Sequence, residues 1–176
     1  MLVKGITDED FVNYKVPSMY IATATCSFKC DKEYGAPICQ NSDLVRQPPH
    51  LIDNELIVSR YLNNSITKAI VFGGLEPFDM CWDLMVLIRV FRYVTDDDIV
   101  IYTGYTEEEA GNIIVPFSDK YPDDPNAVNM DVLSALRVFK NIVVKFGRYV
   151  PNQQPHYDPV LGVFLASDNQ YAERIS

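Results

Sequence analysis

The sequence predicts an α/β domain with a mostly parallel sheet, either open or curled into a partial, TIM-like barrel; we take the partial barrel as the prediction. Short, almost wholly apolar segments alternate with helix-like segments, a pattern typical of strands buried on both faces. Glycines follow two of these apolar segments, as expected where strands end beside a ligand. The length of 176 residues corresponds to a single domain over residues 1–176.

The first elements are expected to deliver the chain to its cysteines. Thr7 precedes three acidic residues, an arrangement typical of a helix start, so a short helix should run to about Tyr14. The β-branched and aromatic residues of segment 19–25 then predict a strand that ends at Cys26.

The middle of the chain is expected to form a helix, a strand and a second helix. Asp53 is a good N-cap for a helix that ends at 63–65. The apolar run 66–72 predicts a strand that stops at the pair Gly73-Gly74. Segment 79–94 is apolar nearly all round, which suits a helix packed on a sheet.

The same alternation continues toward the carboxyl terminus. Residues 99–102 indicate a buried strand that ends at Thr103-Gly104, and Thr106 with three following glutamates predicts a helix start. The remaining segments are, in order, a loop over 116–129, a helix over 131–139, a strand over 142–146, and an irregular tail over about 147–176.

Composition and charge exclude several classes of partner. Fifteen Lys and Arg against 24 Asp and Glu leave a net charge of −9, which repels nucleic acid and anionic lipid unless a basic patch intervenes, and the sequence has none. No apolar run approaches the roughly 20 residues that cross a bilayer. The amino terminus lacks the layout of a signal peptide. We therefore expect no nucleic-acid or membrane partner and a cytoplasmic location.

Three cysteines give the main chemical signal. Cys26, Cys30 and Cys39 fall within one short segment, and in a reducing compartment such a cluster is more typical of metal or redox sites than of disulfides. An iron–sulfur cluster held by three thiolates keeps one iron open for another ligand, whereas a zinc site needs a fourth protein ligand. Candidates for that fourth ligand are Cys81, His50 and His156. Buried apolar cysteines are the alternative, which the charged spacer 31–35 makes less attractive.

Three features are expected to meet at one end of the sheet. The cysteine segment, Gly73-Gly74 and Thr103-Gly104 each follow a predicted strand. Loops at the carboxyl ends of parallel strands converge, and glycine lets the backbone approach a ligand closely. A ligand site is therefore predicted at this edge.

Several motifs occur in a familiar order along the chain. They are Asp10-Phe11-Val12-Asn13, Cys26-Ser27-Phe28-Lys29-Cys30 with Cys39-Gln40-Asn41, Gly73-Gly74-Leu75-Glu76-Pro77, Ile101-Tyr102-Thr103-Gly104-Tyr105, and Leu165-Ala166-Ser167-Asp168-Asn169-Gln170. This series resembles radical S-adenosylmethionine enzymes, in particular the activating proteins of anaerobic ribonucleotide reductase.

The resemblance implies a [4Fe–4S] cluster with S-adenosylmethionine on its open iron, cleaved by one electron to a 5′-deoxyadenosyl radical. The implied site residues are Cys26, Cys30 and Cys39 for the cluster, and Gly73, Gly74, Glu76 and Thr103 for S-adenosylmethionine. The implied partners are a larger glycyl-radical enzyme, such as anaerobic ribonucleotide reductase, and an electron donor such as flavodoxin or ferredoxin.

The cysteine spacing departs from the superfamily pattern. Eight residues separate Cys30 from Cys39 where the superfamily has two, so six are inserted. A turn over 34–37 can loop out and return Cys39, because the cost of closing a loop grows only slowly with its length. Two alternatives stay open: a related radical enzyme with a small or nucleotide-like substrate, and a non-catalytic, metal-stapled protein-binding module.

Overall fold

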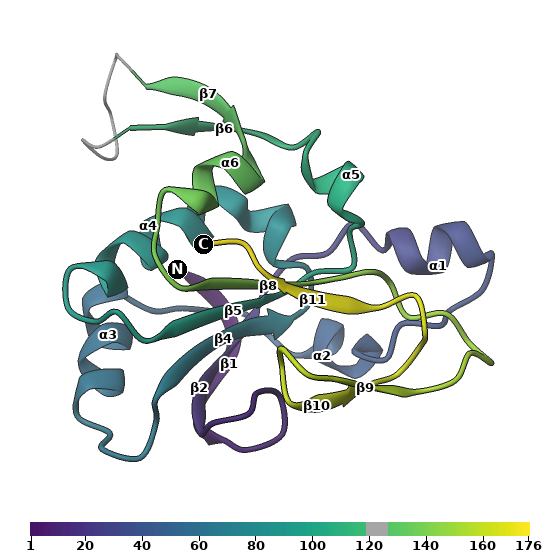
Figure 1. The fold of residues 1–176 in the computed structure, drawn as a ribbon, viewed down its shortest axis with the longest axis horizontal. Coiled ribbons are helices and arrows are strands. Elements are labelled where there is room, and N and C mark those ends of the chain that lie inside the picture. Colours follow the sequence, from purple (N-terminus) through teal and green to yellow (C-terminus); the bar gives the residue numbers. More distant parts are fainter. Residues whose placement is uncertain (119–126) are drawn as a thin grey trace.

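The computed structural model describes residues 1–118 and 127–176, which contain a seven-stranded mixed sheet (Figure 1). In spatial order its strands are β11 (Tyr171–Arg174), β8 (Ile142–Phe146), β5 (Asp98–Tyr102), β4 (Ala69–Gly74), β2 (Ser18–Thr23), β1 (Leu2–Asp10) and β3 (His50–Leu51). The mixed α/β class is therefore confirmed, and the partial barrel stays a prediction.

The prediction of a mostly parallel sheet is wrong. The ladders from β2 through β4 and β5 to β8 are parallel, whereas β1–β2, β1–β3 and β11–β8 are antiparallel. The apolar runs that the sequence pattern detects are the central strands, buried on both faces. The antiparallel strands lie at the edges, where one side can stay polar and the pattern is weaker.

The prediction of an amino-terminal helix over 7–14 is also wrong. Residues 7–10 belong to strand β1, and the residues after them form a turn. Ile6 and Thr7 pair with Ile21 and Tyr20 of β2. The Asp10 carboxylate accepts the backbone N–H of Asn13 at 3.0 Å, so this acid shapes a turn instead of a helix start. Long-range strand pairing has overridden the local capping signal.

Most other elements lie near their predicted positions. The helices are α1 (Lys29–Tyr34), α2 (Ser42–Arg46), α3 (Asn54–Leu62), the 3₁₀ turn η1 (Pro77–Met80), α4 (Cys81–Arg92), α5 (Glu107–Ala110) and α6 (Val132–Arg137). Strand β4 begins three residues later than predicted and includes both glycines. Helices α1 and α2 were not predicted. Among the described residues, no helix is long and apolar enough to cross a membrane.

Two hairpins complete the fold. β6 (Ile114–Phe117) and β7 (Val128–Asp131) pair where a loop over 116–129 was predicted, and the centre of that loop, 119–126, lies outside the described residues. β9 (His156–Asp158) and β10 (Val163–Leu165) pair within the tail that was predicted to be irregular. The β6–β7 hairpin projects from the body of the protein (Figure 1).

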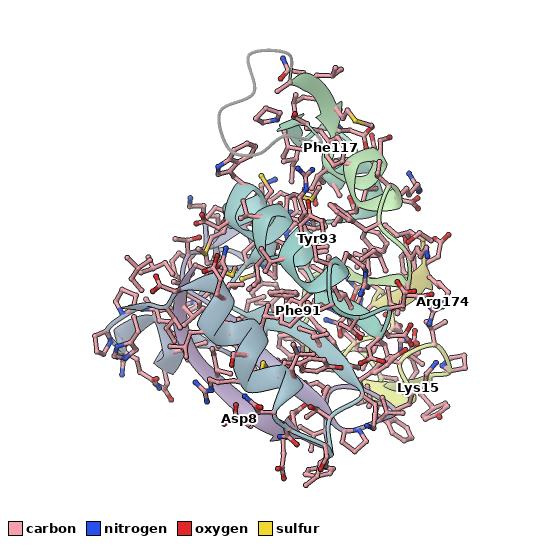
Figure 2. All side chains as sticks on the ribbon, turned by 90° about the vertical axis from the view of Figure 1, so that its left-hand side faces the viewer. Asp8, Lys15, Phe91, Tyr93, Phe117 and Arg174 are labelled. Atoms are coloured by element: carbon pink, nitrogen blue, oxygen red, sulfur yellow. The ribbon has the colours of Figure 1, made fainter. Side chains whose placement is uncertain are left out.

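The sheet has an apolar core on each face. Helices α3, α4 and α6 cover the first face, on which Figure 2 labels Phe91 of α4. Phe91 contacts Tyr61 of α3 edge-on, with 5.6 Å between the ring centres. On the second face, Val71 and Val100 of the sheet pack with Leu161 and Leu165 of the carboxyl-terminal segment. The carboxyl ends of the parallel strands lie between these layers and carry the candidate site.

Candidate functional site

A cavity of about 340 Å³ lies at the carboxyl ends of β2, β4, β5 and β8. Of the seven site residues expected from the resemblance, six line it: Cys26, Cys30, Cys39, Gly74, Glu76 and Thr103. Gly73 lies one residue back in β4, where an added Cβ would come within 2.7 Å of the Tyr20 hydroxyl oxygen. The structure therefore confirms that the segments after these strands meet at one edge of the sheet.

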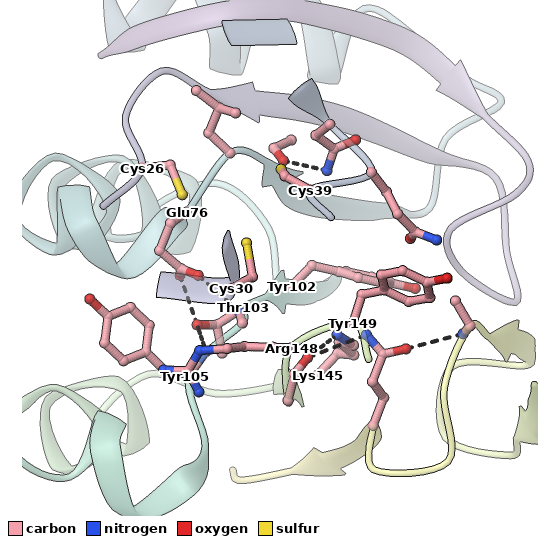
Figure 3. A pocket seen from close by; sticks show the side chains of 18 of the residues that line it. Cys26, Cys30, Cys39, Glu76, Tyr102, Thr103, Tyr105, Lys145, Arg148 and Tyr149 are labelled. Atoms are coloured by element: carbon pink, nitrogen blue, oxygen red, sulfur yellow. Dashed lines mark hydrogen bonds between the residues drawn. The ribbon is translucent and has the colours of Figure 1, made fainter. Parts of the chain in front are cut away.

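The three thiols occupy one side of this cavity (Figure 3). Cys26 follows β2, Cys30 lies in α1, and Cys39 follows the inserted loop. All three thiols line the cavity, and Cys39 is close enough to Cys30, and Cys30 to Cys26, to raise the pKa of its neighbour. Across residues 1–118 and 127–176, no group of three or more His, Cys, Asp or Glu side chains forms a ready site for a single metal ion.

The thiols of Cys26 and Cys30 are protonated at neutral pH in the metal-free protein. Burial raises the pKa of Cys26 to about 12, and the carboxylates of Glu76 and Asp79 add to this effect. Burial also raises the pKa of Cys30 to about 11, with the neighbouring Cys39 as the next cause. Any metal that these sulfurs bind must therefore displace their protons.

Asp31 closes the inserted loop. One of its carboxylate oxygens accepts the backbone N–H groups of Ile38 and Cys39, both at 2.9 Å. Gly35 ends α1 with a positive φ of 75°, a conformation that glycine adopts without strain. The predicted return of Cys39 to the other cysteines is thus achieved by a capped helical turn and a carboxylate.

Glu76 is a buried carboxylate held by hydrogen bonds from two segments. It accepts the backbone N–H of Phe78 at 3.0 Å, the hydroxyl of Thr103 at 2.7 Å and the backbone N–H of Gly104 at 2.8 Å. Burial raises its pKa to about 7, although these three bonds favour the charged form. Thr103 lines the cavity while its hydroxyl donates to this carboxylate.

The carbonyl groups of the glycine pair each accept a hydrogen bond from a side chain. Thr23 donates its hydroxyl to the Gly73 carbonyl at 2.9 Å, and the Asn41 amide donates to the Gly74 carbonyl at 2.6 Å. Asn41 links the cysteine segment directly to the end of β4.

Sequence reasoning missed Lys145, a buried lysine in the cavity wall. Its side chain donates to the Gly147 carbonyl at 2.6 Å, and burial lowers its pKa to about 8 while Glu76 acts in the opposite direction. The available signal was a single lysine inside the apolar strand 142–146.

Asp79 and Arg148 were missed as well. Asp79 accepts the backbone N–H of Ser27 and, at 2.6 Å, the hydroxyl of Tyr105, so it joins the start of the cysteine segment to the end of β5. Arg148 lies across the cavity from the thiols (Figure 3). No local signal marks either residue, because their roles depend on contacts between distant segments.

The other predicted candidates lie elsewhere. Cys81 begins α4 and packs against the core of the first face, as the interpretation of a core cysteine predicted. His50 lies in β3 at the opposite edge of the sheet from β11. Comparison with protein-family models, with curated proteins and with solved structures returned no match.

Proposed function

We propose that this chain is a radical S-adenosylmethionine enzyme, in which Cys26, Cys30 and Cys39 hold a [4Fe–4S] cluster. The observation that carries the proposal is that these thiols share one cavity with the Gly74–Glu76 segment and Thr103, which come from separate loops. When bound, the cluster and S-adenosylmethionine would supply one-electron cleavage to a 5′-deoxyadenosyl radical. The partial-barrel form of the domain belongs to the same proposal.

The three cysteine sulfurs are of the chemical type that binds iron–sulfur clusters. Cysteine sulfurs are soft ligands that favour iron–sulfur clusters, and three of them leave one iron available to a second molecule. Zinc would instead need a compact tetrahedral group with sulfurs about 2.3 Å from one ion. The described residues offer no ready group of three or more such ligands around one ion.

Glu76 and Lys145 fit the amino-acid end of S-adenosylmethionine. Both residues are buried, at 7% and 6% exposed, and both line the cavity. A zwitterionic α-amino acid carries an ammonium group for the carboxylate of Glu76 and a carboxylate for the ammonium of Lys145. Both groups already have hydrogen-bond partners in the protein, and a ligand with the two opposite charges would stabilise their buried charged forms further.

We assign the hydrogen donor to a protein partner, a glycyl-radical enzyme. A second cavity of about 380 Å³ adjoins the first and shares Tyr20, Gln40, Asn41 and Gly74 with it. It lies against β1 and β2, and the proposal places a loop of the partner there. A flavodoxin- or ferredoxin-like reductant and a reducing, cytoplasmic setting complete the proposal.

Anaerobic reconstitution tests this function. The full chain, incubated with iron and sulfide, should bind about four of each and turn brown, because thiolate-to-iron charge transfer absorbs visible light. Addition of S-adenosylmethionine should change the electron paramagnetic resonance signal of the reduced protein, and 5′-deoxyadenosine should then accumulate. A colourless protein, or one that retains a single zinc, would contradict the proposal.

A further inference from the structure

The helix that carries Cys30 is too weak to hold its own position. Helix α1 has six residues, none of them buried, and its N-cap residue Phe28 makes no side-chain capping bond. Isolated helices of this length are unstable in water because nucleation is costly. Contacts with other segments must therefore fix α1 at the cavity.

Those contacts are ionic, and they connect α1 to α5. Lys29 lies 3.6 Å from Glu109 and 4.3 Å from the centre of the Tyr105 ring. Glu33 lies 3.2 Å from the guanidinium of Arg148, which in turn lies 2.6 Å from Glu109. Two side chains of α1 thus meet one ion-pair network.

The two residues of this network that lie outside α1, Glu109 and Arg148, are held in place by further contacts. Glu109 is part of a capping box, in which it accepts the backbone N–H of Thr106 at 2.9 Å and donates its own N–H to the Thr106 hydroxyl. The Arg148 side chain is only 12% exposed, and its carbonyl accepts the Asn169 amide at 2.9 Å. Its stem passes Gly104, where an added Cβ would lie 3.5 Å from Arg148 Cγ.

We propose that Arg148 is a positioning residue that holds α1 against α5 and so keeps Cys30 and Cys39 turned toward the cavity. Glu109 anchors the guanidinium, and Glu33 is its contact on α1. We call the ion pairs Glu33–Arg148 and Arg148–Glu109 the latch. The latch needs no metal to form, and only its role in placing cluster ligands rests on the proposed function.

Thiol alkylation of the metal-free full chain tests the latch. Iodoacetamide labelling at one fixed pH, followed site by site by mass spectrometry, measures how often each cysteine is exposed. Arg148→Met and Glu33→Gln should each raise the labelling rates of Cys30 and Cys39 by about three- to five-fold, the factor that a partly exposed ion pair supports. Cys81, which is partly buried against the core of the first face and lies outside the cavity, should label at an unchanged rate and serves as the internal reference.

Three matched variants separate positioning from general damage. Lys32→Gln removes a charge from the exposed side of α1 and should change no rate. Glu109→Gln keeps the capping box, since glutamine can accept the same Thr106 bond, and should act like Glu33→Gln. Arg148→Lys should restore part of the protection, because it keeps the charge and loses the forked geometry.

Unchanged labelling of Cys30 and Cys39 in Arg148→Met would overturn the latch, and so would an equal rise at Cys81. Reconstitution separates this result from the proposed function. If the wild-type protein binds no iron and sulfide while the labelling pattern is as expected, the latch stands and the radical chemistry falls. If iron and sulfide bind but labelling is unchanged, the proposed function stands without the latch.

Discussion

Lys145 and Glu76 are two buried groups whose charged forms are both disfavoured by burial in the cavity wall. Burial raises the pKa of Glu76 to about 7 and lowers that of Lys145 to about 8, so both groups titrate near neutrality. Each shift means that the folded protein disfavours the charged form of that group relative to the unfolded chain. The two charges should therefore destabilise the ligand-free fold.

Replacing Lys145 should reveal this cost as a pH-dependent stability difference. Between pH 8 and 10.5 the unfolded lysine holds more protons than the folded one, so wild-type stability rises with pH relative to Lys145→Met. The difference should change by up to ~1.4 kcal/mol per pH unit, the energy equivalent of one pKa unit. Urea unfolding of both proteins from pH 7 to 10 measures it.

The sign of that difference is the decisive part. Lys145→Met should be at its most stable relative to wild type near pH 7, and the advantage should shrink as pH rises. Lys140→Met removes an exposed lysine, which pairs with Asp96 at 3.6 Å, and controls for the loss of one lysine charge from the surface. A Lys145→Met difference that does not change with pH would show that the lysine keeps its ordinary pKa.

The ligand set makes a second residue-level prediction. Cys39→Ala should abolish iron–sulfur binding and the release of 5′-deoxyadenosine, because the cluster then has two protein ligands. Cys81→Ala should leave both largely intact, since Cys81 packs against the core outside the cavity. Iron and sulfide analysis with product chromatography compares the two variants. Loss of iron in Cys81→Ala with retention in Cys39→Ala would mean that the ligand set is wrong.

At the scale of elements, the sequence predicted those whose signals are local. The capping box at Thr106 and the apolar strand over 99–102 both occur as expected. Strand β1 was mistaken for a helix because its acids follow Thr7, and only pairing with β2 makes it a strand. Helix α1 was missed because it buries no residue, and its ion pairs are with Glu109 of α5 and with Arg148, which are distant in sequence. Elements that depend on distant partners leave little trace in local patterns.

The end of β4 depends on a backbone conformation that only glycine adopts easily. Gly74 has a φ of 83°, and an added Cβ would lie 2.9 Å from the Ala22 Cα. Gly74→Ala should therefore lower the free energy of unfolding by at least ~1–2 kcal/mol, from strain in the left-handed region and from the clash. Chemical denaturation measures the change.

Gly5→Ala is the matched control for this substitution. Gly5 also lies in the sheet, but an added Cβ meets no atom within 4 Å there. The control should stay within ~0.5 kcal/mol of wild type, as for other open positions. Equal effects of the two substitutions would show that Gly74 owes nothing to its conformation.

At the scale of the whole molecule, strand order explains why the site could be located but not completed from sequence. The cysteines, Glu76 and Thr103 follow parallel strands, so their convergence follows from topology. Lys145 and Arg148 also follow this rule, because β8 is parallel to β5, but neither lies in a recognisable motif. The carboxyl-terminal segment that contains the β9–β10 hairpin covers the second face of the sheet, and we call it the cover. Its sequence has no periodic hydrophobic pattern, and polar contacts contribute to its structure.

Asp158 is the main polar contact of that cover. The buried carboxylate accepts the backbone N–H groups of Val160 and Leu161, both at 2.9 Å, and that of Ala172 in β11 at 2.8 Å. It therefore joins the β9–β10 hairpin to the edge of the main sheet. Asp158 thus adds a polar link to the apolar contacts that Leu161 and Leu165 make with the sheet.

Asp158→Asn should loosen the cover without unfolding the sheet. The amide can still accept the turn bonds, but its NH₂ group faces the N–H of Ala172, so one buried donor loses its partner at a cost of about 1–3 kcal/mol. Hydrogen–deuterium exchange should accelerate in β9, β10 and β11 and stay unchanged in β4 and β5, the central strands. Glu173→Gln, an exposed change on β11, should leave both regions as in wild type. Uniform acceleration across all strands in Asp158→Asn would instead mean that the cover and the sheet unfold as one unit.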